Sequence, residues 1–183
     1  MADVKKWIHD AYAMQLTRRE GSGGDAVSGR LYGIARSVWM GKIMCAVENQ
    51  PRPYPELLQF LYAPEHTDSQ FQVLRRAARG AVLVAENGIR KPPQERVWNK
   101  LGDLAEVALF EYRAIQRGEG PWKQAVITMM AGIDDGNWRK PERRWAARYH
   151  IMQNALHRWE RRALEQPRRV VEEIEAAQEK ENA

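Results

Sequence analysis

The stretch GNWRKPERRWAARYHIMQNALHRWERRALEQPRR, residues 136–169, gives the clearest helix signal in the C-terminal part of the chain. Its large apolar residues recur every three or four positions, at Trp145, Tyr149, Met152, Leu156, Trp159 and Ala163. At about 100° per residue these side chains fall within about 40° of one direction, which is the buried stripe of an amphipathic α-helix. Pro141 suits the first turn of a helix, so we expect this helix to run from 141 to about 165.

The other side of this predicted helix is rich in arginine. The stretch holds ten of the chain's 29 Lys and Arg residues. Those that share one side are Arg143, Arg144, Arg148, Arg158, Arg161 and Arg162. Like charges one helical turn apart cost roughly 0.2–0.5 kcal/mol per pair, so such a face needs a reason. Three explanations are open: binding of nucleic acid, docking of an acidic protein surface, and plain solvation.

Nucleic acid is the explanation we favour, because the planar fork of arginine suits phosphates and the guanine edge. Asn154 is placed to contact an adenine, and Ala147 or Ile151 a thymine methyl group. A preceding helix over 122–132 completes a helix-turn-helix pair, although the link over 133–140 exceeds the usual three or four residues. The predicted DNA-binding residues are Lys123, Arg139, Lys140, Arg143, Arg144, Ala147, Arg148, Ile151, Asn154 and Arg158.

The rest of the sequence also predicts helices. Apolar periodicity and Gly or Pro punctuation place them at about 3–19, 25–47, 55–63, 67–85, 93–117 and 121–132. No stretch alternates apolar and polar residues between hairpin turns, so the expected fold is all-α, a compact multi-helix bundle with a C-terminal helix-turn-helix-like part. We divide the chain into a helical body (1–118), a helix-turn-helix-like DNA-binding part (119–166) and an acidic tail (167–183) that is flexible or a frayed helix.

Composition limits the function classes. The net charge of +5 is small, but the charge is unevenly distributed, because 139–169 carries +7 and 170–183 carries −4. The single cysteine, Cys45, is typical of a reducing cytoplasm, where we expect the protein to work. No apolar run approaches the roughly 18 residues of a membrane span, so we expect no membrane association.

The sequence shows no strong catalytic or metal-binding motif. The four histidines lack a surrounding set of ligands, and no phosphate-binding loop or dinucleotide fingerprint is present. Asp103 and Glu106, one helical turn apart, and the neighbouring Asp134 and Asp135 in a loop are candidates for binding Mg²⁺. Such pairs are far more often solvated, so we expect a binding protein that is not an enzyme and uses no metal and no cofactor.

One short segment is unusually apolar. PRPYPELLQFLYAPEH, residues 51–66, is either part of the core, which we favour, or a patch for a protein partner. The residues of that possible partner patch are Leu57, Leu58, Leu61 and Tyr62.

The C-terminal half also resembles a known family. A small, basic, helical chain in which WKQAVITMMAGI (122–133) is followed, after a loop, by PERRWAARYHIMQNALHRWERRAL (141–164) resembles the late-gene antitermination proteins of bacteriophages and prophages. It looks most like their AlpA-type branch, which regulates lysis genes of pseudomonads. The resemblance covers roughly residues 60–165 in size and layout.

This resemblance implies a transcription factor that binds a DNA element near a promoter, loads on paused RNA polymerase and promotes read-through of terminators. Arg143, Arg144, Arg148 and Asn154 would then lie at the groove. Its partners would be double-stranded DNA and bacterial RNA polymerase. The rival hypotheses are a small-terminase-like packaging or replication protein that forms a ring, a protein-only adaptor that docks an acidic partner, and a nuclease that uses Asp103 and Glu106.

Overall fold

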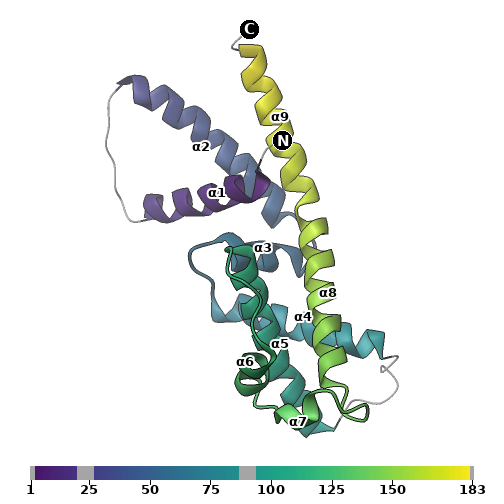
Figure 1. The fold of residues 1–183 in the computed structure, drawn as a ribbon. Helices are drawn as coiled ribbons and strands as arrows, with labels where there is room; N and C mark the ends of the chain where they lie inside the picture. The colour runs from purple at the N-terminus through teal and green to yellow at the C-terminus, as the bar shows by residue number, and fades with distance from the viewer. Residues whose placement is uncertain (1–2, 20–26, 87–93, 182–183) are drawn as a thin grey trace. The chain divides into compact units, whose positions relative to one another are not determined.

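The computed structural model describes residues 3–19, 27–86 and 94–181, and this part of the chain consists of helices joined by turns, without a strand (Figure 1). The helices are α1 (Val4–Arg19), α2 (Val27–Glu48), α3 (Tyr54–Tyr62), α4 (Asp68–Ala85), α5 (Glu95–Gln116), α6 (Gln124–Met130), α7 (Asp135–Trp138), α8 (Trp145–Ala163) and α9 (Glu165–Glu181). The all-α prediction is confirmed for the described residues. Within them, every helix is too short or too polar to cross a bilayer. The predicted helix starts at 25 and 93 lie outside the described residues.

The chain folds as two units, and the predicted boundaries at 118 and 166 differ from theirs. Unit 1 combines Met1–Thr67 with Glu160–Ala183, and unit 2 is Asp68–Trp159. The difference has a physical cause at each end. Helices α4 and α5 pack on each other within unit 2, and α9 packs on α1 and α2 within unit 1. Segments far apart in the sequence therefore share a core.

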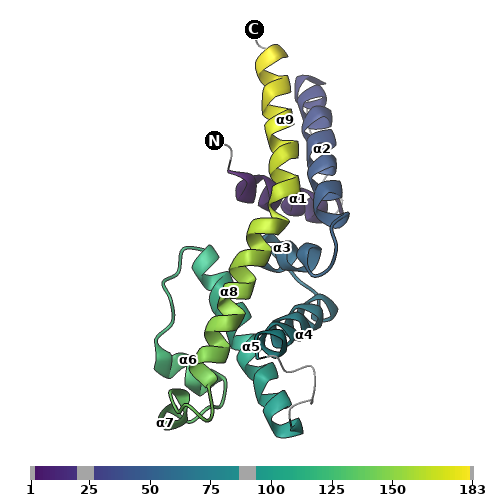
Figure 2. The same ribbon diagram turned by 90° about the vertical axis from the view of Figure 1, so that its right-hand side faces the viewer.

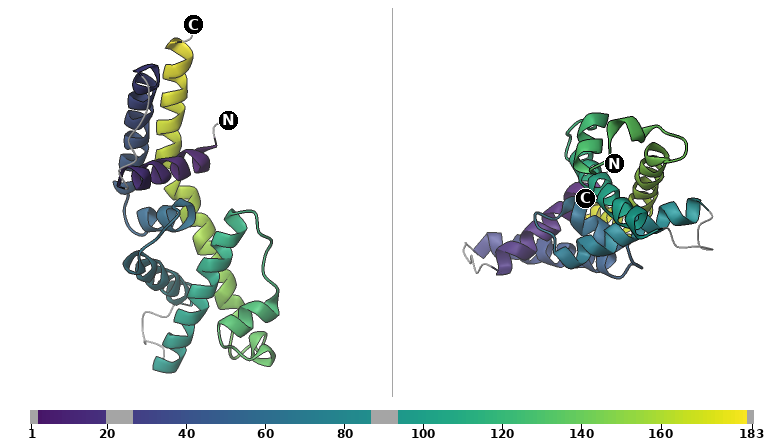
Figure 3. Two further views of the ribbon diagram at one scale, coloured as in Figure 1. Left: turned by 90° about the vertical axis from the view of Figure 1, so that its left-hand side faces the viewer. Right: turned by 90° about the horizontal axis from the view of Figure 1, so that it is seen from below.

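Helix α9 corrects the interpretation of the acidic tail as flexible over residues 167–181, while residues 182 and 183 lie outside the described part of the chain. It lies alongside α2 in two views of the ribbon (Figures 2 and 3). Val171 and Ile174, one turn apart, are buried, whereas the glutamates at 172 and 173 are exposed. Burial of these two apolar side chains holds the segment as a helix, because an isolated acidic helix of this length is marginal in water.

The core of unit 1 is built from one side of each of its helices. Its fully buried members include Ile8 of α1, Ile43 of α2 and Leu57, Leu58 and Phe60 of α3. The possible partner patch on α3 is therefore wrong, because Leu57, Leu58, Leu61 and Tyr62 are all buried. Pro55 near its start and the apolar residues around it form a core helix, which was the alternative we favoured. The Tyr62 hydroxyl donates a hydrogen bond to Glu160 Oε1, which also pairs with Lys5 at 3.0 Å.

The core of unit 2 lies between α4, α5 and α8. It includes Val82 of α4, Leu104 of α5, Ile127 of α6 and Trp138 of α7. Helix α8 adds the predicted stripe, of which Trp145, Tyr149, Met152 and Leu156 are buried, as is Ala163 in unit 1, while Trp159 is half-buried. The stripe is thus confirmed, and the opposite side of α8 remains for other contacts.

Candidate nucleic-acid interface

The positive charge of the protein belongs to unit 2. Unit 2 contains 16 Lys and Arg residues against 10 Asp and Glu residues, a formal charge of +6. Unit 1 contains 13 against 14, a formal charge of −1. A polyanion is therefore attracted to unit 2, although the whole chain is only moderately basic.

The most basic surface of unit 2 is the turn over 139–144. The Lys140 carbonyl accepts hydrogen bonds from the N–H groups of Arg143 and Arg144, both at 3.0 Å. The resulting tight turn leaves the side chains of Arg139, Lys140, Arg143 and Arg144 exposed. Arg139 donates to Gln124 Oε1 of α6 at 3.3 Å, which links the turn to the preceding helix. Four cations thus lie on one short segment.

The backbone of Arg144 explains why α8 begins later than predicted. Its φ is 56°, in the left-handed region that non-glycine residues rarely adopt, while its carbonyl accepts the first hydrogen bond of α8 from Arg148. A helix cannot continue through this residue toward Pro141. The prediction of a helix from 141 is therefore wrong, and Arg143 and Arg144 lie on the turn instead of on the face of α8.

The predicted basic face of α8 is only partly available. Ala147, Asn154 and Arg158 are exposed, as predicted for a surface that contacts DNA. Ile151 is half-buried and packs against the core of unit 2, so its methyl groups are not free to meet a thymine. The side chain of Arg148 is engaged in an ion pair with Glu86.

Arg148 forms a two-point ion pair with Glu86 at the end of α4. Its Nε and Nη2 atoms donate to Glu86 Oε1 and Oε2, each at 3.1 Å, and its guanidinium lies 5.1 Å from the centre of the Trp145 ring. The side chains of Arg148 and Glu86 are only 16% and 14% exposed. Arg144 adds a longer contact to Glu86 at 3.6 Å. Arg148 therefore stabilises the packing of α8 against α4, which corrects its assignment to the DNA groove.

Replacement of Arg148 by alanine is accordingly expected to lower the free energy of unfolding by about 2–3 kcal/mol, because a mostly buried carboxylate loses its paired donor. The matched control is Arg158→Ala on the same helix, whose exposed side chain has no ion pair within the described residues and whose loss is expected to cost at most about 0.5 kcal/mol. Urea unfolding of both variants checks this. If Arg148→Ala and Arg158→Ala are equally stable and only Arg148→Ala loses DNA binding, Arg148 belongs to the DNA interface after all.

A pocket beside the turn adds cations that the sequence did not single out. It has a volume of about 260 Å³ and lies between the start of α5 and the segment from 132 to 145. Arg96, Lys100 and Arg143 line it together with Asn137 and one carboxylate, that of Asp134. Lys100 is already engaged, since its Nζ donates to the Ala131 carbonyl at 3.2 Å and pairs with Asp103 at 3.3 Å.

Arg96 and Arg143 are thus the two pocket cations that remain for an anion, since neither has an ion pair within the described part of the chain. The volume is slightly below the roughly 300 Å³ of small-ligand pockets and suits a single phosphate group and its neighbours. The signal that could have found this site is the pair of like charges at 96 and 100, one turn apart on a predicted helix.

The connection between α6 and α8 differs from the short turn of a standard helix-turn-helix. It runs from 131 to 144 and contains the short helix α7 (Figure 1). Trp138 of α7 is buried, and its ring centre lies 5.6 Å from that of Tyr149 of α8. The connection is therefore a packed part of the core and not merely a linker. Lys123, just before α6, is exposed.

A buried polar network holds the segment that leads to α6. Glu111 of α5 is buried, and its Oε1 accepts the N–H of Trp122 at 2.8 Å. Its Oε2 accepts a hydrogen bond from Gln153 Nε2 of α8, also at 2.8 Å. Burial raises the pKa of Glu111, and the Trp122 N–H and the nearby His150 oppose that shift. The network fixes the position at which Lys123 enters α6.

This raised pKa predicts a pH-dependent stability. The folded state binds the Glu111 proton more tightly than the unfolded state does, so protonation of Glu111 stabilises the fold. This contribution to the free energy of unfolding is complete below the usual glutamate pKa and is lost as pH rises through the raised pKa. Glu111→Gln keeps an acceptor for the Trp122 N–H and is expected to remove this part of the slope. The check is the difference in unfolding free energy between wild type and Glu111→Gln from pH 4 to pH 8. A difference that stays constant with pH would contradict the role of the buried carboxylate.

The candidates for metal chemistry are engaged in structural contacts. Asp103 and Glu106 pair with Arg75 at 3.4 Å and 3.8 Å. No cluster of three or more His, Cys, Asp or Glu side chains suitable for a metal ion occurs among the residues that the structure describes. His157 Nδ1 lies 3.1 Å from the Tyr112 hydroxyl, and the two rings pack edge to face. Asp103 and Glu106 thus form ion pairs, and His157 packs against Tyr112.

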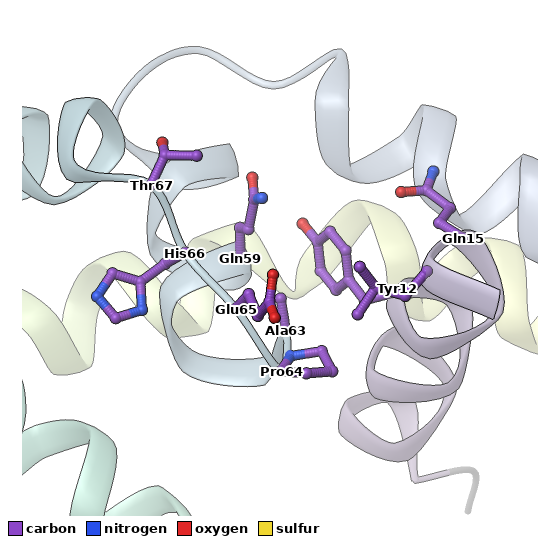
Figure 4. A pocket seen from close by; sticks show the side chains of 9 residues that line it. Tyr12, Gln15, Gln59, Ala63, Pro64, Glu65, His66 and Thr67 are labelled. Atoms are coloured by element: carbon purple, nitrogen blue, oxygen red, sulfur yellow. The ribbon is translucent and has the colours of Figure 1, made fainter. Parts of the chain in front are cut away.

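Unit 1 also contains a small pocket, of about 150 Å³ (Figure 4). The ring of Tyr12 stands between α1 and the segment that carries Ala63, Pro64 and Glu65. Burial raises the pKa of Tyr12, and Glu48 adds to the shift, so the phenol stays protonated. At about half the lower limit of the roughly 300–1,000 Å³ typical of small-ligand pockets, this cavity is better explained as a packing gap.

Comparison of the chain with protein-family models finds no matching model, and comparison with curated proteins and with solved structures finds no match either.

Proposed function

We propose that this protein is a cytoplasmic DNA-binding transcription regulator that acts as an antitermination factor. The observation that carries DNA binding is the concentration of charge: unit 2 carries +6, and four exposed cations lie on the turn over 139–144. Positive charge gathered on one exposed segment is the footprint of a phosphate-binding surface. Glu142 is the one acidic residue in that turn.

The cations of the turn are suited to positioning the duplex. Arg139, Lys140 and Arg143 are exposed, and Arg143 also lines the pocket with Arg96. Contacts to phosphates fix register and orientation but carry no sequence information. Sequence would be read by the exposed side of α8, through Asn154 and Ala147.

The conformation of Arg144 supports a functional role for the turn. A non-glycine residue in the left-handed region costs about 1–2 kcal/mol, and such strain is most often retained at binding and active sites. Arg144→Gly would relieve the strain at that φ, yet the chain has arginine there. Arg144 keeps a side chain that is 53% exposed on the turn, beside its 3.6 Å contact with Glu86.

The antitermination role rests on the resemblance of residues 60–165 to phage and prophage late-gene antiterminators, and its implied partners are double-stranded DNA and bacterial RNA polymerase. The test is transcription in vitro on a template that carries the protein's own promoter-proximal DNA followed by a terminator. Addition of the protein is expected to increase the full-length transcript on this template but not on one with the upstream element scrambled. Equal read-through on both templates, or none on either, would refute antitermination.

A further inference from the structure

Helix α6 exposes apolar side chains on one side. Val126, Met129 and Met130 are 37%, 72% and 49% exposed. Their spacing of three and four residues places them together on the helix surface, opposite the buried Ile127 and Thr128. Two other exposed large hydrophobic residues in the described part of the chain, Val38 and Val84, lie singly on other helices. Three exposed apolar side chains on one seven-residue helix form an apolar patch, and such patches often mark sites where another protein binds.

A groove continues this patch onto α5. It has a volume of about 390 Å³, and its apolar walls are Phe110 and Ala114 of α5, Trp122, and Met130 of α6. Met130 belongs to both the groove and the exposed side of α6, so the two form one surface. Methionine, tryptophan and phenylalanine are enriched where proteins bind one another, and the flexible thioether adapts to a partner's shape. An apolar surface of this kind does not suit a duplex backbone.

The charged residues that line the groove favour a partner of the opposite charge. Arg113 and Arg117, one turn apart at the end of α5, line the groove with one carboxylate, Glu119. Burial lowers the pKa of Arg113, and the nearby positive charge of Arg117 adds to the shift. With two cations against one carboxylate, the lining of the groove carries net positive charge and favours an acidic partner. Arginine is also the cation most often found at protein interfaces, because its planar fork pairs with carboxylates.

We propose that the groove of α5 and α6 docks an amphipathic helix of a protein partner, with the partner's apolar stripe on Trp122 and Met130 and its acidic residues on Arg113 and Arg117. A helix that binds in a groove presents its own apolar anchors every three or four residues, and Phe110, Ala114, Trp122 and Met130 provide the apolar walls for them. None of the groove residues belongs to the turn over 139–144, so the proposal does not depend on DNA binding.

The test is selection from a display library of helical peptides of about 18 residues, with a fixed apolar stripe and randomised flanking positions. Peptides enriched on the full-length protein are expected to carry Glu or Asp beside the stripe. Their affinity, measured by fluorescence anisotropy, is expected to fall more than tenfold on Met130→Asp and on Arg117→Glu. Lysine-flanked versions of the same peptides are expected to bind Arg117→Glu better than wild type. The matched control is Val84→Asp, which places the same charge at an exposed apolar position of unit 2 and is expected to leave binding unchanged.

Several outcomes would overturn the proposal. One is enrichment of peptides without acidic flanks, and another is equal binding to wild type and Met130→Asp. A third is self-association in light scattering that disappears in Met130→Asp, since this would assign the groove to a second copy of the chain. Circular dichroism of each variant shows whether its fold is retained, which is expected because the substituted side chains are exposed or line the groove.

Discussion

Replacement of Arg139, Lys140 and Arg143 by glutamine is expected to weaken binding to duplex DNA by about 100- to 1,000-fold at 0.1 M salt. Each side chain is exposed and is assigned one phosphate contact, and a net contribution of about 1–1.4 kcal/mol per contact gives this loss over three contacts. The plot of log K against log salt concentration should become shallower by about 2.7, since each phosphate contact contributes about 0.9. Fluorescence anisotropy at several salt concentrations measures both quantities.

The matched control removes the same charge elsewhere. Lys42, Arg169 and Lys180 are exposed cations of unit 1, and their replacement by glutamine lowers the net charge by the same three units. We expect this control to change affinity by less than about threefold at 0.1 M salt, where the Debye length is about 10 Å. Equal losses in the two triple variants would show that net charge governs binding and that the turn over 139–144 has no special role. Unchanged melting temperatures are expected for both, because none of the six side chains belongs to a core.

Replacement of Leu58 by alanine is expected to lower the free energy of unfolding by about 3–4 kcal/mol. Leu58 is fully buried in α3, and removing its isobutyl group leaves a cavity in addition to the lost burial of apolar surface. This effect distinguishes a core helix from the partner patch that the sequence left open. The control is Val38→Ala on α2, whose side chain is half exposed and whose truncation is expected to cost less than about 0.5 kcal/mol. Urea unfolding in which Leu58→Ala costs no more than Val38→Ala would place α3 outside the core.

The sequence was sufficient for the elements whose boundaries depend on local chemistry. Helix α4 runs from Asp68 to Ala85, close to the predicted 67–85, because the sequence offers Thr67 or Asp68 as a capping residue and a regular apolar stripe defines its inner side. The buried stripe of α8 was predictable for the same reason. Only α9 among the helices was mistaken for a tail, because two apolar residues among glutamates make a weak pattern until α1 and α2 are present to cover them.

Features that arise from contacts between distant residues were not predictable. Arg148 and Glu86 are separated by 62 positions, so nothing local indicates that this arginine is paired while Arg158 is exposed. The late start of α8 depends on the left-handed backbone of Arg144, whereas Pro141 is a usual first-turn signal. Arg96 joined the candidate site because the start of α5 packs near Arg143.

The assignment of DNA binding to unit 2 is tested most directly by titrating the full-length protein into labelled promoter-proximal DNA from its own locus and into scrambled DNA, at two salt concentrations. We predict tight binding that prefers the native sequence and weakens steeply as salt rises. Weak binding that is the same for both sequences and vanishes at physiological salt would contradict the assignment, and the turn over 139–144 would then be a solvated or protein-facing surface.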